Sequence, residues 1–258
     1  MATPTPDARQ YGAEHAHIYD DLYRSDHEHA ARLALLRALT PDGAILELGV
    51  GTGRIALPLA RAGLRMWGVD CSPEMLGILR DKDPEGLVRI IEGDFTELER
   101  VVATRRFAVV AATMSVLYGL ATLEAQRRAV AGAFAILEPG GHFVVDAWLP
   151  RTANISSRTG HAYERTIRMG CRVSVSLSID TENQRVNHLM LITEPGRAPD
   201  ELRRSDRYIP VVELDQMAIA AGFTVAGRWA DYAKSSFRKS SDQHVSVYRK
   251  PPRKLPPS

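Results

Sequence analysis

The stretch AILELGVGTGR, residues 44–54, decides the fold of this chain. It begins as a short, mostly apolar strand, and glycines then follow at the alternate positions Gly49, Gly51 and Gly53. Because glycine has no Cβ, such a turn bends sharply and lets a ligand come close to the backbone. A helical pattern over 55–62 follows, and the free N–H groups at its start suit a carboxylate or another anion. A strand, a glycine turn and a helix in this order indicate a binding site for a nucleotide-type cofactor.

Strand and helix patterns alternate on the C-terminal side of this stretch. After the strand 44–48, further strands are expected at 65–69, 88–92, 107–113 and 142–147, with helices at 55–62, 73–80 and 123–137. Each connection is long enough for a crossover between parallel strands. A helix at 211–221 and strands at 223–229 and 244–249 follow later in the chain. We therefore expect an α/β fold with a doubly wound, Rossmann-like sheet of seven strands, most of them parallel.

The sequence pattern changes after residue 150. The runs 172–179 and 185–192 alternate apolar with polar residues around 180–184, which predicts an antiparallel hairpin. A helix is expected over 14–39, ahead of the first strand. The expected organisation is a disordered tail (1–10), an N-terminal helical cap (11–43), a cofactor-binding core (44–149), a β-rich insertion after the fifth strand (150–206), the end of the core (207–249) and a second disordered tail (250–258).

Charge and composition exclude several classes of function. The formal net charge is +2, from 33 Lys and Arg against 31 Asp and Glu, so nothing indicates a nucleic-acid partner. The chain has no apolar run of about 18 residues and no signal segment, which predicts a soluble, cytoplasmic protein without a membrane partner. Cys71 and Cys171 match no metal-ligand spacing, and we expect no metal site.

Asp70 narrows the cofactor that the glycine turn would bind. It ends the second expected strand, 17 positions after Gly53, where a carboxylate can accept hydrogen bonds from both hydroxyls of a ribose. Nicotinamide and flavin sites share this arrangement. They expect the spacing Gly-x-Gly-x-x-Gly, however, whereas the third glycine of this turn comes one position early.

Four elements resemble those of class I S-adenosylmethionine-dependent methyltransferases. Residues 47–53 resemble motif I of that family, 70–76 the element after it, 93–95 the loop that covers adenine, and 137–143 the turn before the fifth strand. They occur in the family's order, and separate matches in order are far more specific than one glycine motif. The resemblance implies S-adenosylmethionine as the cofactor.

The resemblance also implies a role for each matching residue. Glu47 should organise the glycine turn, while Gly49 and Gly51 pass close to the methionine part of the cofactor. Asp70 should bind the ribose hydroxyls. The remaining contacts to the cofactor are expected near adenine or at the end of the fourth strand, from Cys71, Met75, Asp94, Phe95, Met114 and Ser115.

The N-terminal segment carries a second, narrower resemblance. Tyr11 to Asp20 is similar to a segment of small-molecule methyltransferases, including the N-methyltransferases of amino sugars and of glycine. In those enzymes the helix lies over the cofactor. The similarity implies that Tyr19 approaches the sulfonium or carboxylate end of the cofactor and that Tyr11 binds the substrate. Two tyrosines that simply pack a helix onto the sheet are the alternative.

Methyl transfer from a sulfonium needs alignment and exclusion of water more than a covalent intermediate. Tyr118 follows the fourth strand, and Asp146 and Trp148 end the fifth, at the edge where such sheets bind ligands. We name these three as catalytic candidates and Tyr11, Tyr118 and Trp148 as substrate-binding candidates. His142 and His188 fall in strand patterns and are expected to be structural.

The leading hypothesis is a methyltransferase that acts on a nitrogen or oxygen atom of a small molecule, in specialised metabolism. The alternatives are a methyltransferase acting on RNA or protein, a nicotinamide-dependent oxidoreductase, and a binding protein that keeps the fold without catalysis. The insertion also has an excess of arginines, which would either bind an anionic substrate or form a solvated face. The insertion is further expected to be the contact of a homodimer.

Overall fold

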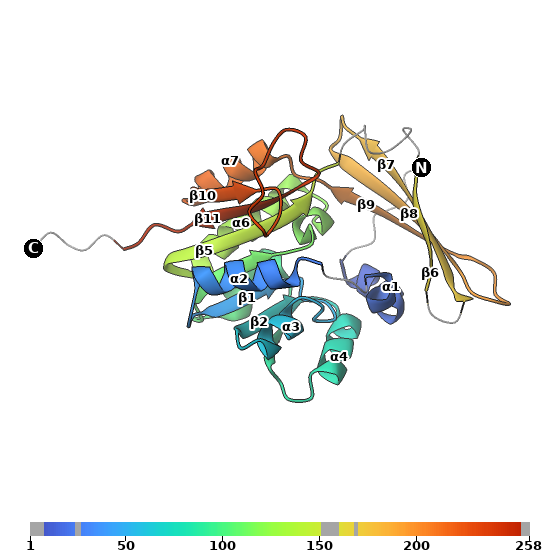
Figure 1. The fold of residues 1–258 in the computed structure, drawn as a ribbon, viewed down its shortest axis with the longest axis horizontal. Coiled ribbons are helices and arrows are strands. Elements are labelled where there is room, and N and C mark those ends of the chain that lie inside the picture. Colours follow the sequence, from blue (N-terminus) through green and yellow to red (C-terminus); the bar gives the residue numbers. More distant parts are fainter. Residues whose placement is uncertain (1–7, 24–26, 151–159, 168–169, 254–258) are drawn as a thin grey trace, which may run out of the picture.

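The computed structural model describes residues 8–23, 27–150, 160–167 and 170–253, with two β-sheets and helices around them (Figure 1). The helices are α1 (Ala8–Leu22), α2 (His29–Leu39), α3 (Ala56–Arg61), α4 (Pro73–Lys82), η1 (Phe95–Glu97), α5 (Leu98–Val102), η2 (Val116–Gly119), α6 (Leu123–Ile136) and α7 (Val211–Ala221). The strands are β1 (Ala44–Leu48), β2 (Arg65–Asp70), β3 (Val88–Glu92), β4 (Phe107–Ala112), β5 (Leu137–Trp148), β6 (Gly160–Thr166), β7 (Arg172–Asp180), β8 (Arg185–Thr193), β9 (Asp200–Arg207), β10 (Thr224–Trp229) and β11 (Gln243–Arg249).

The larger sheet has seven strands in the order β10-β11-β5-β4-β1-β2-β3. Strands β1 to β5 pair in parallel, and β11 is antiparallel to both β5 and β10. The expected Rossmann-like, mostly parallel sheet is confirmed. Its strand order reverses between β1 and β4, and ligands of such sheets bind beside the carboxyl ends of the strands at that reversal.

Helices cover both faces of this sheet, which is why its central strands are apolar throughout. Alternate residues of one strand point to opposite faces, so Ile45 packs with α2 and α3 while Leu46 packs with α5, α6 and α7. Val109 and Val110 of β4 divide in the same way. The two core layers hold the glycine turn after β1 in a fixed position.

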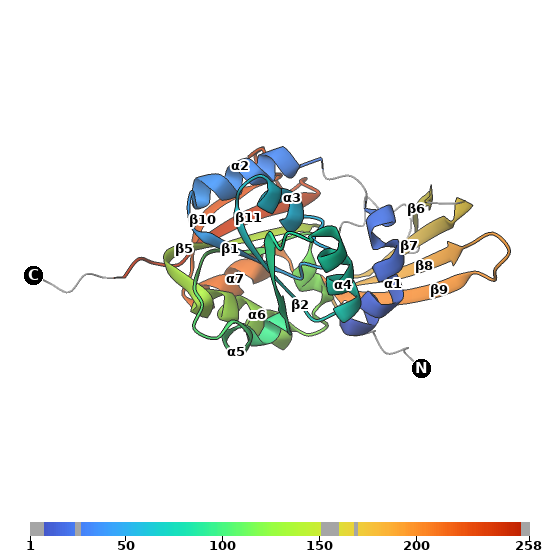
Figure 2. The ribbon, with the colours of Figure 1, turned by 90° about the horizontal axis from the view of Figure 1, so that it is seen from below.

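The smaller sheet is antiparallel in the order β6-β7-β8-β9. Its central pair runs from Arg172 opposite Thr193 to Asp180 opposite Arg185, which confirms the expected hairpin. Helix α1 packs on one face of this sheet through Ile18 and Leu22. Figures 1 and 2 both place α1 between α4 of the large sheet's layer and the small sheet.

Arg207, at the end of β9, joins the two sheets through a buried polar cluster. Its guanidinium donates to Gln126 on α6 (2.6 Å) and to Glu213 on α7 (2.6 Å). The Gln126 amide in turn donates to the carbonyls of Leu117, Leu120 and Arg207. The small sheet is therefore fixed to the large one by charge-assisted bonds rather than by a loose linker.

Three boundaries differ from the sequence expectation. The single helix expected over 14–39 is two helices, because α1 packs on the small sheet and α2 on the large one. Helix α1 begins at Ala8, inside the range expected to be disordered. Strand β5 begins at Leu137 rather than 142, since Gly140 and Gly141 exchange backbone hydrogen bonds with Lys250 beyond β11.

Both expected tails are partly described. Helix α1 accounts for residues 8–10, and the Lys250 ammonium donates to the carbonyls of Phe134 and Leu137 at 2.7 and 2.8 Å. Residues 1–7 and 254–258 lie outside the described residues.

None of the described helices is long and apolar enough to cross a membrane.

Replacing Gln126 with leucine is expected to lower the free energy of unfolding by about 2–4 kcal/mol, because three carbonyls and a guanidinium lose a buried partner. Urea unfolding followed by circular dichroism measures this change. Gln216→Leu on the exposed face of α7 is the matched control and should stay within about 0.5 kcal/mol of the wild type. Equal stability of the two variants would show that the cluster does not hold the sheets together.

Candidate active site

The glycine turn after β1 lies at the reversal of the strand order. Gly49 and Gly51 have φ angles of +66° and +52°. A Cβ on Gly49 would lie 2.3 Å from Val116, so that position is closed by packing, whereas a Cβ on Gly51 would meet nothing within 4 Å. The turn is therefore tight on one side and open at Gly51, where a ligand can approach the backbone.

Asp70 connects the end of β2 to this turn. Its carboxylate accepts hydrogen bonds from the backbone N–H of Gly51 at 2.8 Å and of Ser72 at 2.9 Å. Burial raises the pKa of this carboxyl, and the two N–H donors oppose that shift. Asp70 thus shapes the turn at the position where a ribose would present its hydroxyls.

Glu47 is a buried carboxylate on β1, 3% exposed. One oxygen, Oε1, accepts a hydrogen bond from the Thr113 hydroxyl at 2.7 Å. Among the described residues, the other oxygen, Oε2, is buried without a partner. Burial raises the pKa of Glu47 to about 7. A cation placed at Oε2 would satisfy this oxygen and favour the ionised form.

The residues expected around adenine lie in the first turns of α4 and η1 or just before these helices. Met75 is buried in α4, and its N–H donates to Ser72, which caps that helix. Cys71 is half-buried, and burial raises the pKa of its thiol to about 11. Asp94 is exposed and accepts from the Thr96 N–H at 2.7 Å, beside buried Phe95. Their contacts to adenine stay predictions.

Met114 and Ser115 follow β4 in an unusual backbone conformation. Their φ angles are +53° and +59°, which costs a non-glycine residue of order 1 kcal/mol or more. The Asp146 carboxylate accepts from the Met114 N–H at 2.7 Å, and the Trp148 N–H donates to the Ser115 hydroxyl at 3.1 Å. These bonds hold the strained segment, and they leave the Met114 side chain 46% exposed.

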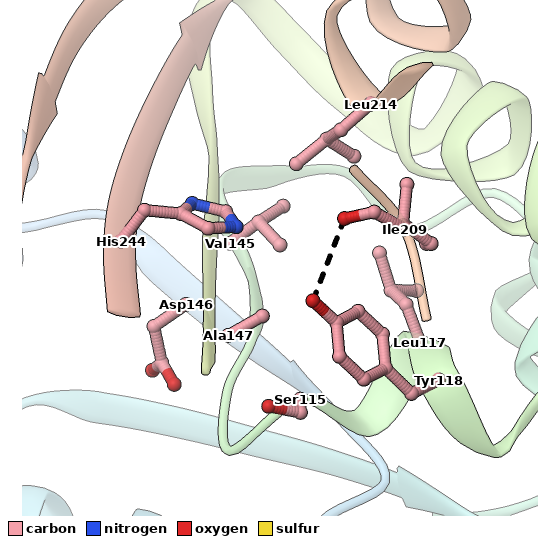
Figure 3. A pocket seen from close by; sticks show the side chains of 9 residues that line it. All are labelled: Ser115, Leu117, Tyr118, Val145, Asp146, Ala147, Ile209, Leu214 and His244. Atoms are coloured by element: carbon pink, nitrogen blue, oxygen red, sulfur yellow. Dashed lines mark hydrogen bonds between the residues drawn. The ribbon is translucent and has the colours of Figure 1, made fainter. Parts of the chain in front are cut away.

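Two of the three expected catalytic residues, Tyr118 and Asp146, lie together where β4 and β5 end, and the third, Trp148, is the last residue of β5. Ser115, Tyr118 and Asp146 line one small pocket, with Ile209 and His244 on its other side (Figure 3). The Tyr118 hydroxyl is turned into the protein and donates to the carbonyls of Trp148 at 2.8 Å and Ile209 at 3.4 Å. Burial raises the pKa of this phenol further above its usual value.

Asp146 also belongs to a buried cluster that the sequence did not indicate. The Tyr232 hydroxyl donates to its second oxygen at 2.5 Å, and the Arg32 guanidinium stacks over the Tyr232 ring at 4.5 Å. Burial raises the pKa of Asp146, while Arg32 opposes the shift. Asp146 therefore connects α2 and the β10–β11 connection to Met114. No motif links these segments, so only the fold reveals the cluster.

Helix α1 lies directly over the glycine turn. The Thr52 hydroxyl donates to Asp20 at 2.6 Å, and the Lys82 ammonium binds the other Asp20 oxygen at 2.7 Å. At the other end of the helix, a Cβ on Gly12 would lie 2.0 Å from the Ser72 hydroxyl. The helical cap expected from the sequence is thus fastened at both ends to the cofactor-binding layer.

Aromatic side chains of α1 face the small sheet and the turn. The Tyr11 ring stacks on His15 with centroids 4.2 Å apart, and the Arg204 guanidinium lies 4.7 Å from the Tyr11 centroid. Tyr19 contacts Tyr23 at 4.9 Å, and burial raises the pKa of Tyr19 to about 12. Both tyrosines are partly buried between the two sheets.

Three observations fit S-adenosylmethionine at this site. The open face of Gly51 leaves space for a ligand against the backbone. Asp70 places a carboxylate at the end of β2, and Glu47 offers a buried, unpartnered oxygen that suits an ammonium group. Within the described parts of the chain, no group of three or more His, Cys, Asp and Glu could hold a metal ion.

Comparison with known proteins gives the same class of enzyme. A family model described as "Methyltransferase domain" matches residues 45–141. The structure of the CcbJ methyltransferase from Streptomyces caelestis is 31% identical, with a TM-score of 0.82, over 95% of this chain and 100% of that one. The cypemycin N-terminal methyltransferase of a Streptomyces species is 27% identical over 205 residues, 79% of this chain and 81% of that protein.

A further relative is the dTDP-3-amino-3,4,6-trideoxy-alpha-D-glucopyranose N,N-dimethyltransferase of Streptomyces venezuelae. It is 27% identical over 229 residues, which are 86% of this chain and 93% of that protein. The likeness to CcbJ is sufficient in identity and coverage to establish the family. The chain therefore belongs to the class I S-adenosylmethionine-dependent methyltransferases, as the residues of its glycine turn predict.

Proposed function

We propose that this methyltransferase transfers a methyl group to a nitrogen atom of a small molecule, with an oxygen atom as the second choice. The observation that carries the proposal is that helix α1 and the small sheet cover the site. Helix α1 and the small sheet lie over the turn at the carboxyl edge of β1, fastened by Asp20 to Thr52 and Lys82. A covered site suits a small acceptor, and one relative is named as an N,N-dimethyltransferase of an amino sugar, another as an N-terminal methyltransferase.

The residues of the turn would hold the cofactor at its two ends. Asp70 would accept the ribose hydroxyls, and Glu47 would accept the ammonium through Oε2. Gly49 and Gly51 would let the backbone approach the methionine part, with Cys71, Met75, Asp94 and Phe95 near adenine. When bound, the cofactor supplies an already activated methyl group. The protein then has to align the acceptor and exclude water.

Tyr11, Tyr19 and Met114 are the residues that we propose to build the acceptor chamber. The two rings come from α1, and the exposed Met114 side chain comes from the end of β4. Together they offer an apolar wall with phenol groups, which excludes water and orients an amine. An amine must arrive uncharged to act as a nucleophile.

Of the three catalytic candidates, we propose that Tyr118 and Asp146 act as positioning residues. The Tyr118 phenol is committed to two carbonyls, and Asp146 to Met114 and Tyr232. The Trp148 backbone fixes Ser115 and accepts from Tyr118, and its half-buried ring remains a candidate wall of the acceptor chamber.

The arginines of the insertion bear on the charge of the acceptor. Arg165 and Arg185 donate to the backbone carbonyls of Leu22 and Ala121. The other described arginines pair with acids: Arg172 with Glu164, Arg197 with Glu194, Arg203 with Glu201, Arg204 with Asp206, and Arg207 with Glu213. Arg151, Arg158 and Arg168 lie outside the described residues. Paired guanidinium groups have little charge left for an anion, which supports an acceptor that is not strongly anionic.

Two further parts of the proposal rest on the sequence. The near-zero net charge supports an enzyme that acts without nucleic acid. The lack of an apolar run of about 18 residues supports a place in the cytoplasm.

A homodimer would form through the outer face of the small sheet, which presents Leu191, 36% exposed. Analytical ultracentrifugation of the wild type and Leu191→Glu tests this contact, and monomers in both would reject it.

The proposed function is tested with labelled cofactor and a panel of acceptors. Transfer of label to small amines, with none to RNA or protein, is the expected result. Label found only in a macromolecule would overturn the small-molecule proposal. Calorimetric titration with S-adenosylhomocysteine, the product form of the cofactor, checks the site itself.

The affinity for S-adenosylhomocysteine is expected to rise with pH between about 6 and 8. The pKa of Glu47 is raised to about 7 in the free protein, so below that pH the carboxyl is protonated and must lose its proton to bind an ammonium. Each unit below pH 7 should weaken binding up to about tenfold. Glu47→Gln should bind more weakly at pH 8 and lose this pH dependence, whereas the same slope in the variant would exclude Glu47 as its source.

Tyr118→Phe is expected to leave kcat within about threefold of the wild type. The hydroxyl that it removes bonds to the Trp148 and Ile209 carbonyls, so its loss should instead lower the unfolding free energy by roughly 1–2 kcal/mol. Steady-state kinetics and urea unfolding separate the two effects. A kcat loss of about a hundredfold or more at unchanged stability would return Tyr118 to a role in proton transfer.

A further inference from the structure

We propose that Arg54 binds the carboxylate of the cofactor and thereby couples cofactor binding to the closure of helix α1. The inference deepens the proposed function, because it rests on the cofactor site built by Glu47 and Asp70. Arg54 comes directly after Gly53, the last glycine of the turn, and precedes helix α3.

The guanidinium of Arg54 has an unused donor inside the protein. Nη1 donates to the Tyr23 carbonyl at 3.4 Å, and the guanidinium lies 5.6 Å from the centroid of the Tyr23 ring. Nη2 is buried and has no hydrogen-bond partner among the described residues. Leaving a charged donor buried and unsatisfied is costly, so this nitrogen marks the place of an absent anionic or carbonyl acceptor.

Glu47 and Arg54 flank the same glycine turn with opposite charges. Oε2 of Glu47 and Nη2 of Arg54 are both buried without a partner in the described structure. Burial raises the pKa of Glu47, and Arg54 is one of the groups that oppose this shift, so the two charges lie close enough to interact. A ligand end that carries an ammonium and a carboxylate on one carbon satisfies both atoms at once.

The guanidinium of Arg54 also contacts Tyr23, at the end of the helix that covers the site. Tyr23 directly follows the last residue of α1, where helix carbonyls lack partners and the helix dipole attracts a cation. A carboxylate bound to Arg54 would fix the guanidinium in the orientation that bonds Tyr23. The hydrogen bond from Thr52 to Asp20 forms without a ligand. The hydrogen bond from Arg54 to the Tyr23 carbonyl would reach its full strength only when a carboxylate is bound to Arg54.

This coupling determines the order in which the cofactor and the acceptor bind. Helix α1 carries Tyr11 and Tyr19, so the acceptor chamber is complete only when the end of the helix is held. The cofactor would bind first and the acceptor second. By thermodynamic reciprocity, closure of α1 must tighten cofactor binding by the same factor.

Three adenosyl ligands separate the groups involved. S-adenosylhomocysteine carries both ammonium and carboxylate, its decarboxylated analogue keeps only the ammonium, and 5′-methylthioadenosine has neither. Calorimetry should show that Arg54→Ala weakens S-adenosylhomocysteine by about 10–100-fold, while the other two ligands change less than about threefold. Arg54→Lys keeps the charge without the bidentate fork and should fall between the wild type and Arg54→Ala.

Hydrogen exchange of residues 8–23 reports the coupling without any turnover. S-adenosylhomocysteine should slow exchange in α1 of the wild type, and neither the decarboxylated analogue nor the Arg54→Ala variant should show that slowing. Arg61→Ala is the matched control, because Arg61 also follows the turn and donates to a backbone carbonyl, that of Lys82 at 3.1 Å. It should behave as the wild type in both measurements.

The outcomes distinguish this inference from the proposed function. If Arg54→Ala weakens all three ligands equally, or none, Arg54 does not bind the carboxylate. If the analogues protect α1 as well as S-adenosylhomocysteine does, the coupling to the cap is refuted while the cofactor site stands. If the wild type binds none of the three ligands, the proposed cofactor site itself fails.

Discussion

The burial of Glu47 is the constraint on which the site depends. Glu47 lies opposite Ala111 across the β1–β4 pair, so Thr113, the residue that follows β4, presents its hydroxyl on the same face. One carboxylate oxygen is satisfied in this way, and the other is left for a ligand. Glu47 and Thr113 can meet because the strand order places β4 beside β1, at the point where the order reverses. The buried second oxygen of Glu47 is thereby held ready for a cation.

The roof follows from the same geometry. Ligands sit beyond the carboxyl ends of the strands, so whatever covers that edge encloses them. Helix α1 can do so because Gly12 allows its backbone to approach Ser72 and because Asp20 reaches both Thr52 and Lys82. Its other face needs an apolar partner, and the small sheet supplies one around Val173. The small sheet thus buries one face of helix α1.

Much of the large sheet was predictable, because its signals are local. The periodicity of β1 to β4, the turn after β1 and the hairpin of β7 and β8 each lie within a few residues. Strand β9 was not expected, since Asp200–Arg207 is rich in charged residues. The alternation of its side chains can be recognised as that of a strand only once it pairs with β8. The role of the Pro139–Gly141 segment in β5 likewise needs Lys250, more than a hundred residues away.

At the site, the sequence identified side chains but not the direction in which they point. Tyr118 and Asp146 were expected at the edge of the sheet, and both are there. Their polar atoms face Trp148 and Tyr232, however, and such pairings depend on rotamers and on connections far along the chain. Arg54 shows the reverse case, in which a residue with no distinctive pattern becomes informative through one unsatisfied nitrogen.

The polar groups between α1 and the small sheet indicate how such an enzyme would choose its acceptor. Arg204 is paired with Asp206 and stacked on Tyr11, so its charge is balanced before any acceptor arrives. The acceptor chamber that we propose, with balanced charge and several aromatic rings, would discriminate by shape and by hydrogen bonds to phenols more than by net charge. Hydrophobic shape alone separates similar molecules weakly, whereas a buried donor or acceptor left without a partner is penalised strongly. Specificity in this chamber should therefore depend on the polar atoms of an acceptor that the hydroxyls of Tyr11 and Tyr19 can reach.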